Sequence, residues 1–334
     1  MAKSRNERMA STAENYRAFA REARGRSSQY EELATAIAAD KTVLAFLSSL
    51  PKVKRQPNLL FAAACYLLGE YADIGSLRGL LARRRRELAA TMLRRRTQTN
   101  EAARCATLLP VLARLPQPLA LIEVGASAGL TLLPDRYSYR YSPGDHRVTG
   151  TDPAAPVLDC EARGPVPLPD RVPDVAWRAG LDINPLDVTS GDDVRWLHCL
   201  VWPGETGRRE RLDAALEVAR RDPPAVRQGD LLADLPDLAR QAPAHATLVV
   251  FHSAVLAYVT APDRERFAKT VRGLDAVWLS NEGPGVLPGT GITDGRDHDG
   301  FVLIQDGTTP LACTDGHGTW LDWLALPGFW RIGV

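Results

Sequence analysis

The chain has 334 residues, with 41 lysines and arginines against 40 aspartates and glutamates, so its formal net charge is +1. This near-neutral balance provides no overall field that would draw the chain to nucleic acid or to an anionic membrane. The five cysteines are odd in number and never form C-x-x-C, which argues against a disulfide framework and a zinc ribbon. The N-terminus is too polar for a signal peptide, and no stretch approaches the roughly 20 apolar residues of a membrane span. We therefore expect a cytoplasmic protein.

Apolar residues recur at helical spacing through residues 1–117, which predicts an all-helical N-terminal domain. Residues 58–68 are apolar on nearly every side, so this helix should be buried. Near the end of the domain, a polar helix over residues 96–101 would place Arg96 and Asn100 on one face. We interpret this run as a lid that presents both side chains to a polar or anionic substrate. The alternative is an exposed, capped helix end.

The pattern changes after residue 118, where short apolar runs recur at 119–124, 176–183, 225–228, 246–252 and 276–281. Their alternation with helical or loop segments predicts β/α units and a mostly parallel sheet. Two further apolar runs flank Asp306-Gly307 and predict a C-terminal hairpin. The predicted fold is therefore α/β, with a doubly wound, seven-stranded Rossmann-like sheet over residues 118–334. Residues 131–175 form an insertion, which we interpret as a small β excursion over the carboxyl-terminal edge of the sheet.

The first predicted strand ends in the most informative segment of the chain. Glu123 closes an apolar run, the small-residue turn 125–129 (Gly-Ala-Ser-Ala-Gly) follows, and an apolar helix is expected to begin at Leu130. Glycine permits a tight turn and a close backbone approach to a ligand, and a helix start offers free N–H groups. This pattern is typical of a parallel strand that delivers a ligand-binding loop.

Polar residues also follow the other predicted parallel strands. Asp182 ends the second strand, where doubly wound folds hold ribose hydroxyls, and Asp230 follows the third, where it could accept a hydrogen bond from an adenine amino group. His252 lies at the end of the fourth strand and Glu282 at the end of the fifth. Either could act as a general base, although a lone core histidine is more often a satisfied structural residue.

This order of motifs resembles the Rossmann-like methyltransferases that use S-adenosylmethionine. The resemblance covers about residues 118–315 and rests on Glu123-Val124-Gly125 with Gly129, on residues 180–185, and on Gly229-Asp230. It implies that the loop contacts the methionine part of the cofactor and that the two following acids hold the ribose and the adenine. Carried over residue by residue, it assigns cofactor binding to Glu123, Gly125, Ala126, Ser127, Gly129, Asp182, Ile183, Asp230 and Leu231. The loop departs from the family pattern by having Ser127 where a glycine is usual.

The whole chain is also similar to the bacterial family labelled domain of unknown function 2332. The matching segments are residues 55–60, 95–101, 125–130, 180–182 and 317–320. This family label implies no activity.

The expected function is methyl transfer from S-adenosylmethionine to a small polar molecule, with no metal required. The expected catalytic residues are His252, Glu282, Asn100 and Arg96. Two alternatives stay open. Residues 125–129 also spell G-x-S-x-G, so Ser127 could be the nucleophile of a serine hydrolase with His317 as its base. The chain could also be a non-catalytic nucleoside-binding or scaffold protein.

A further acidic cluster lies in the loop 294–299. A hard cation is conceivable there, but solvated turn residues explain the cluster better. Its members are Asp294, Asp297, His298 and Asp299.

Overall fold

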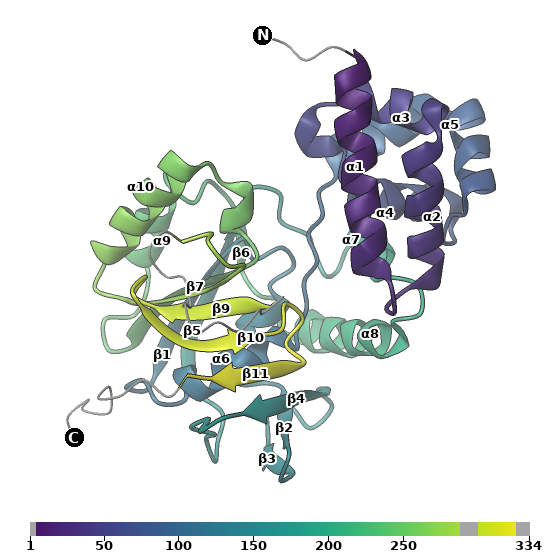
Figure 1. Cartoon of the computed structure of the whole chain (residues 1–334). Coiled ribbons are helices and arrows are strands. Elements are labelled where there is room, and N and C mark those ends of the chain that lie inside the picture. Colours follow the sequence, from purple (N-terminus) through teal and green to yellow (C-terminus); the bar gives the residue numbers. More distant parts are fainter. Residues whose placement is uncertain (1–4, 288–299, 325–334) are drawn as a thin grey trace. The chain divides into compact units, whose positions relative to one another are not determined.

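The structure is a computed structural model that describes residues 5–287 and 300–324. The acidic loop 294–299 therefore lies outside the described residues. The chain forms two compact units (Figure 1), one built from residues 1–99 and 189–210 and the other from residues 100–188 and 211–334. Within the described ranges, none of the helices combines the length and the apolar character that crossing a membrane requires.

The first unit is helical, as predicted. Polar caps and a glycine set its helix boundaries: the Asp40 carboxylate accepts hydrogen bonds from the N–H groups of Thr42 and Val43, and Gly69 ends a helix with a φ of +86°. The apolar helix α4 is buried on most sides. The helices of this unit are α1 (Arg5–Ala23), α2 (Ser28–Ala39), α3 (Lys41–Ser48), α4 (Pro57–Leu68), α5 (Ile74–Arg94) and α7 (Gly191–Cys199), with the short 3-10 helix η1 (Lys52–Lys54). Helix α8 (Thr206–Arg221) begins in the first unit and ends in the second.

The units differ from the predicted helical domain 1–117 at two helices. Helix α6 (Arg104–Leu112) belongs to the second unit, and every one of its residues is buried. Helix α7 belongs to the first unit although it follows the β-rich segment in the chain. The buried guanidinium of Arg95, which follows α5, pairs with Asp192 and Asp193 in the first turn of α7.

The second unit contains one large mixed sheet. The five predicted parallel strands and the C-terminal hairpin are present within one or two residues of their expected positions, so the α/β prediction is confirmed. They are β1 (Leu119–Val124), β5 (Val175–Asp182), β6 (Val226–Gln228), β7 (Thr247–Ser253), β8 (Val277–Glu282), β9 (Phe301–Gln305) and β10 (Thr309–Thr314).

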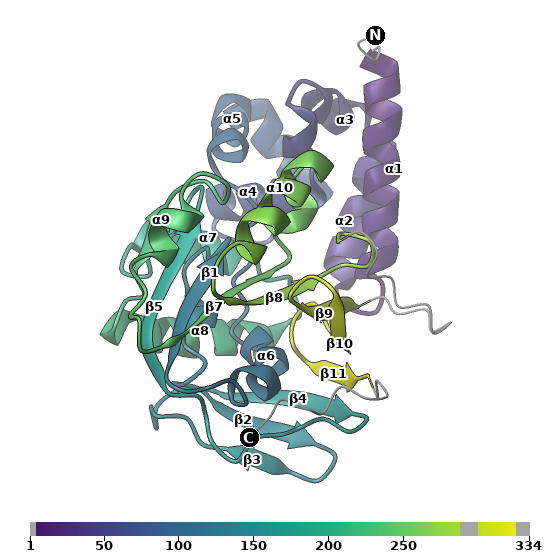
Figure 2. The same ribbon diagram turned by 90° about the vertical axis from the view of Figure 1, so that its left-hand side faces the viewer.

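The prediction of seven strands is wrong, because the described residues form an eleven-stranded sheet in the order β3-β2-β4-β11-β10-β9-β8-β7-β1-β5-β6. Figure 2 shows β2, β3 and β4 beside β11. The insertion supplies β2 (Ser138–Ser142), β3 (His146–Val148) and β4 (Val157–Arg163), and β4 pairs in parallel with β11 (Trp320–Trp323). The tyrosines of β2 explain this outcome. Tyr139 and Tyr141 are buried, and the Tyr141 hydroxyl donates to the carbonyl of Ala106 in α6 at 2.7 Å. The insertion thus extends the sheet and helps to bury α6.

The helix expected at Leu130 is also absent. The loop leads into one turn of 3-10 helix, η2 (Leu130–Leu132), and the chain then enters the insertion. Pro134 follows closely and disfavours a helical conformation for Leu133, which explains why the turn does not continue as an α-helix.

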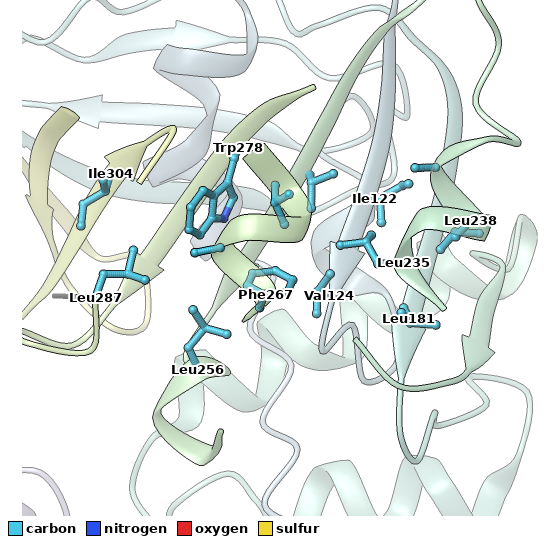
Figure 3. Close-up of a cluster of buried hydrophobic side chains, with 14 of the residues drawn as sticks. Ile122, Val124, Leu181, Leu235, Leu238, Leu256, Phe267, Trp278, Leu287 and Ile304 are labelled. Atoms are coloured by element: carbon cyan, nitrogen blue, oxygen red, sulfur yellow. The ribbon is translucent and has the colours of Figure 1, made fainter. Parts of the chain in front are cut away.

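The register of the parallel strands gives the sheet two distinct faces. Glu123 lies opposite Gly180 and Phe251, so alternate residues such as Ile122, Val250 and Trp278 share the other face. That face packs against α9 (Leu235–Ala239) and α10 (Ala261–Arg272) to form the core drawn in Figure 3. We call it the α10 face. The opposite face, called the α6 face, carries Glu123, whose neighbour Thr131 accepts from the Cys105 thiol of α6.

Candidate functional site

The candidate site lies at the point where successive strands of the chain change from one side of β1 to the other. From β1 the chain adds β5 and β6 on one side, then returns to place β7 and β8 on the other side. In open α/β sheets, ligands bind at the carboxyl ends of the two strands that flank such a switch point. Ser127 after β1 and Ala254 after β7 have φ values of 53° and 59°, which are uncommon for residues with a side chain. Strained backbone of this kind concentrates at functional sites.

The loop after β1 is closely packed. A Cβ atom on Gly125, whose φ is +74°, would lie 2.4 Å from a methyl carbon of Val255. The Gly125 N–H donates to the Leu181 carbonyl at 2.7 Å, and the Ser127 N–H donates to Asp182 Oδ2 at 2.9 Å. The Leu130 N–H donates to Asn100 Oδ1 at 2.8 Å. The N–H groups of Gly125, Ser127 and Leu130 are therefore engaged inside the protein and are not free for a ligand.

An apolar residue and a carboxylate lie at the carboxyl end of each of the strands β5 and β6. Asp182 accepts from Ser127 N and, through Oδ1, from Asn184 N at 2.8 Å, and each carboxylate oxygen can accept more than one hydrogen bond. Ile183 follows at once and is 46% exposed. Asp230, after β6, is exposed and caps its own turn by accepting from the N–H groups of Leu232 and Ala233. Leu231 is partly buried against the core of the α10 face.

Glu123 is a buried carboxyl group at the end of β1. Burial raises its pKa to about 8, while the hydrogen bond with the Thr131 hydroxyl and the charge of Arg104 oppose the rise and the charge of Asp182 adds to it. Its Oε2 atom has no hydrogen-bond partner among the described residues. Arg104 is fixed nearby through Nε to the Gly316 carbonyl at 2.8 Å and Nη1 to the Ser253 carbonyl at 3.3 Å. Perturbed titratable groups in such a place are typical of functional sites.

The predicted lid helix over residues 96–101 is wrong, because residues 95–100 form an irregular segment between α5 and α6. Arg95 adopts an extended conformation and holds the chain to α7 through its ion pairs, so the helix ends there. Asn100 belongs to the second unit and reaches the loop after β1. Arg96 belongs to the first unit, where its side chain is exposed. Its role in the site stays a prediction.

His252 and Glu282 lie on the α10 face. His252 is fully buried, and its Nε2 accepts a hydrogen bond from the indole N–H of Trp278 at 3.0 Å. Because that indole can only donate, Nδ1 of a neutral His252 carries the proton and donates to Glu282 Oε1 at 2.7 Å. The same oxygen accepts from Val255 N at 2.9 Å and Leu256 N at 3.0 Å. This arrangement favours a role in positioning the loop after β7, and a catalytic role for either residue stays a prediction.

Several competing effects act on the Glu282 carboxylate. Burial alone would raise its pKa, but the hydrogen bond from His252, together with those from the two backbone N–H groups, lowers the pKa below its ordinary value. Glu282 therefore stays ionised near neutral pH and holds its three donors strongly.

Sequence reasoning did not select Ser253, which shares a face with Glu123. Ser253 pairs side by side with Asn281, and both lie on the α6 face. Ser253 Oγ and Asn281 Nδ2 have no hydrogen-bond partners among the described residues, while Asn281 Oδ1 accepts from the Thr314 hydroxyl at 2.8 Å. The alternation of side chains along each strand was the available signal, because it separates Ser253 and Asn281 from His252 and Glu282.

The comparisons with known proteins identify a family. A family model described as "Uncharacterized protein conserved in bacteria (DUF2332)" matches residues 13–323. The chain belongs to this family. The resemblance of the whole chain to DUF2332 is thereby confirmed. No match was found among curated proteins or among solved structures.

Proposed function

We propose that this DUF2332 protein transfers a methyl group from S-adenosylmethionine to a small polar molecule. The observation that supports the cofactor best is the exposure of Ile183, which follows Asp182 at the end of β5, while Asp230 follows the neighbouring parallel strand β6. An apolar side chain left 46% exposed directly after a buried strand provides a surface for a flat aromatic ring such as adenine. Asp182 would hold the ribose hydroxyls, and Asp230 would accept from the adenine amino group.

The unpartnered polar atoms near Glu123 also fit this assignment. They lie at the carboxyl ends of β1, β7 and β8, where the methyl acceptor would bind. When bound, S-adenosylmethionine would supply an electrophilic methyl group, with S-adenosylhomocysteine as the leaving group. The protein's contribution is to hold the acceptor in line with that group and to exclude water, and such positioning can supply most of a rate enhancement. The buried Glu123, Ser253 and Asn281 would orient the acceptor.

The decisive experiment is calorimetry with S-adenosylmethionine and S-adenosylhomocysteine on the full chain. We expect micromolar binding that weakens at least tenfold in Asp182→Asn and in Ile183→Asp. Asp237→Asn, an exposed acid on α9 that pairs with Arg240, is the matched control and should bind normally. Thermal melting of each variant checks that it is folded. Absence of binding to the unaltered chain at millimolar ligand would overturn the proposal.

A serine hydrolase is the second candidate, because Ser127 has the positive φ of a strained turn. A fluorophosphonate probe distinguishes the two functions. Labelling that disappears in Ser127→Ala would favour the hydrolase, whereas a methyltransferase should not be labelled.

A further inference from the structure

Three buried side chains on the α6 face each have a polar atom without a hydrogen-bond partner among the described residues. The atoms are Glu123 Oε2, Ser253 Oγ and Asn281 Nδ2. The residues are 4%, 8% and 0% exposed, respectively. Leaving a buried polar group unpaired destabilises a fold, so a cluster of three requires an explanation. A bound ligand that supplies the missing partners is such an explanation.

The register of the sheet brings these three side chains together. Ser253 lies beside Asn281 on the neighbouring strand, and Glu123 lies opposite Phe251, two residues before Ser253. Neighbouring strands are about 4.8 Å apart, so Ser253 and Asn281 can contact one small chemical group. Glu123 lies one strand beyond Ser253 and two residues earlier in register, so its long side chain must extend towards the carboxyl ends of the strands to reach the same group. The Glu123 and Ser253 side chains also flank the switch point of the sheet.

The cluster supplies hydrogen-bond donors. The Thr314 hydroxyl occupies Asn281 Oδ1, which fixes the amide so that Nδ2, a donor, is the unpartnered atom. The Ser253 hydroxyl can donate, and Glu123 can donate while it holds its proton. The guanidinium of Arg104, bound to the Ser253 carbonyl, adds positive charge beside Glu123. Donors side by side near a positive charge suit a planar, negatively charged group with two acceptor oxygens.

We propose that the methyl acceptor carries a carboxylate, and that Asn281, Ser253 and protonated Glu123 bind its oxygens. This inference rests on the proposed function, because it names the class of acceptor for the same site. Replacing Asn281 by aspartate keeps the shape of the side chain and an acceptor for the Thr314 hydroxyl. It replaces the amide donor by a negative charge, which repels a carboxylate ligand.

The test uses the full chain with small probes, in the presence and absence of S-adenosylhomocysteine. Binding of acetate, glycolate and benzoate is compared by calorimetry and ligand-observed NMR with binding of the matched amides and of inorganic phosphate. We expect each carboxylate to bind at least tenfold more tightly than its amide. Asn281→Asp should weaken carboxylate binding tenfold or more, and Ser253→Ala several-fold. Ser280→Ala is the matched control, because Ser280 Oγ is also buried and unpartnered but lies on the α10 face.

The pH dependence gives an independent readout. Carboxylate affinity should fall above pH 8 in the unaltered chain, because the deprotonated Glu123 repels the ligand. Glu123→Gln keeps a donor at this position without a titrating group, so its affinity should stay constant through the same range. If Asn281→Asp does not fold, Ser253→Ala and this pH profile still decide the question.

The outcomes separate this inference from the proposed function. Nucleoside binding with equal affinity for carboxylates and amides, or with tighter binding of phosphate, would overturn the acceptor class and leave methyl transfer standing. Carboxylate binding that depends on Asn281, without binding of either nucleoside, would support the carboxylate site and overturn methyl transfer. Failure of every carboxylate to bind would overturn the inference.

Discussion

Glu123 shows how one buried carboxyl group can link folding stability to pH. Its pKa is about 8 in the folded protein against an ordinary value of 4.5, so between these values the folded state holds a proton that the unfolded state has released. Stability therefore falls as pH rises through this window, by about 1.4 kcal/mol per pH unit, and levels off above pH 8. Between pH 6 and pH 8 the loss is about 2 kcal/mol.

Glu123→Gln should remove this loss, because the amide does not titrate. We expect the variant to gain about 2 kcal/mol relative to the unaltered chain between pH 6 and pH 8, measured by urea unfolding at both values. Glu217→Gln, on the exposed side of α8, is the control and should leave the pH dependence unchanged. A parallel pH dependence in Glu123→Gln and the unaltered chain would contradict the assignment.

Gly125 tests the close packing at the switch point. Alanine at this position would have to adopt a positive φ, which costs about 1–2 kcal/mol. Its Cβ atom would also collide with Val255, so we expect Gly125→Ala to destabilise the fold by about 2–4 kcal/mol in total. Gly285→Ala isolates the first effect, because Gly285 has the same φ of +74° with open space around it. The double variant Gly125→Ala/Val255→Ala should recover stability relative to the sum of the two single changes. Strict additivity in thermal or urea unfolding would show that the contact is unimportant.

At the scale of elements, Glu282 links the end of β8 to the loop after β7. Its carboxylate accepts from His252 and from the backbone of Val255 and Leu256, so Glu282→Gln replaces charge-assisted hydrogen bonds by weaker ones. We expect the hydrogen-exchange protection of the Val255 and Leu256 amides to fall tenfold or more, while the amides of α10 keep theirs. Ser280→Ala, on the same strand and face, should leave all of these amides unchanged. Unaltered protection at Val255 would argue against the positioning role.

The sequence predicted elements well wherever hydrophobic periodicity was decisive. The runs that became β1, β7 and β8 are apolar because both faces of these strands are mostly covered. The predictions that failed have two different causes. The segment after Arg95 depends on long-range structure, because Arg95 is held by acids about 100 positions away. The turn after the loop ends at Leu132 for a local reason, the nearby Pro134, which the apolar pattern does not register. Periodicity within one segment contains neither effect.

The candidate site was predictable in outline and less so in detail. The strand ends were correctly expected to carry polar groups, and Glu123, Asp182 and Asp230 all lie at carboxyl ends of parallel strands. The face on which each side chain projects depends on the register between β1, β7 and β8, which is a property of the assembled sheet. His252 was preferred to Ser253 for its chemistry, although only Ser253 shares a face with Glu123.

At the scale of the whole molecule, the chain path determines which truncations can fold. The sequence-based boundary at residue 117 removes α6 from the sheet unit, although all nine residues of this helix are buried and α6 contacts β4. Its removal would also break two hydrogen bonds: the one from Arg104 to the Ser253 carbonyl and the one from the Tyr141 hydroxyl to the Ala106 carbonyl. We therefore expect a chain of residues 118–334 to lack a cooperative thermal transition and to expose apolar surface to a fluorescent dye.

The matched comparison is a chain of residues 100–334, which retains α6 and its contacts with the sheet. We expect it to show a cooperative transition and near-native near-ultraviolet circular dichroism, because the tyrosines of β2 keep their packing against α6. Tyr141→Phe in the full chain probes the same contact more gently and should cost about 1 kcal/mol, the net contribution of one buried hydrogen bond. Cooperative unfolding of residues 118–334 would show that the sheet does not depend on α6, and would support the predicted domain boundary at residue 117.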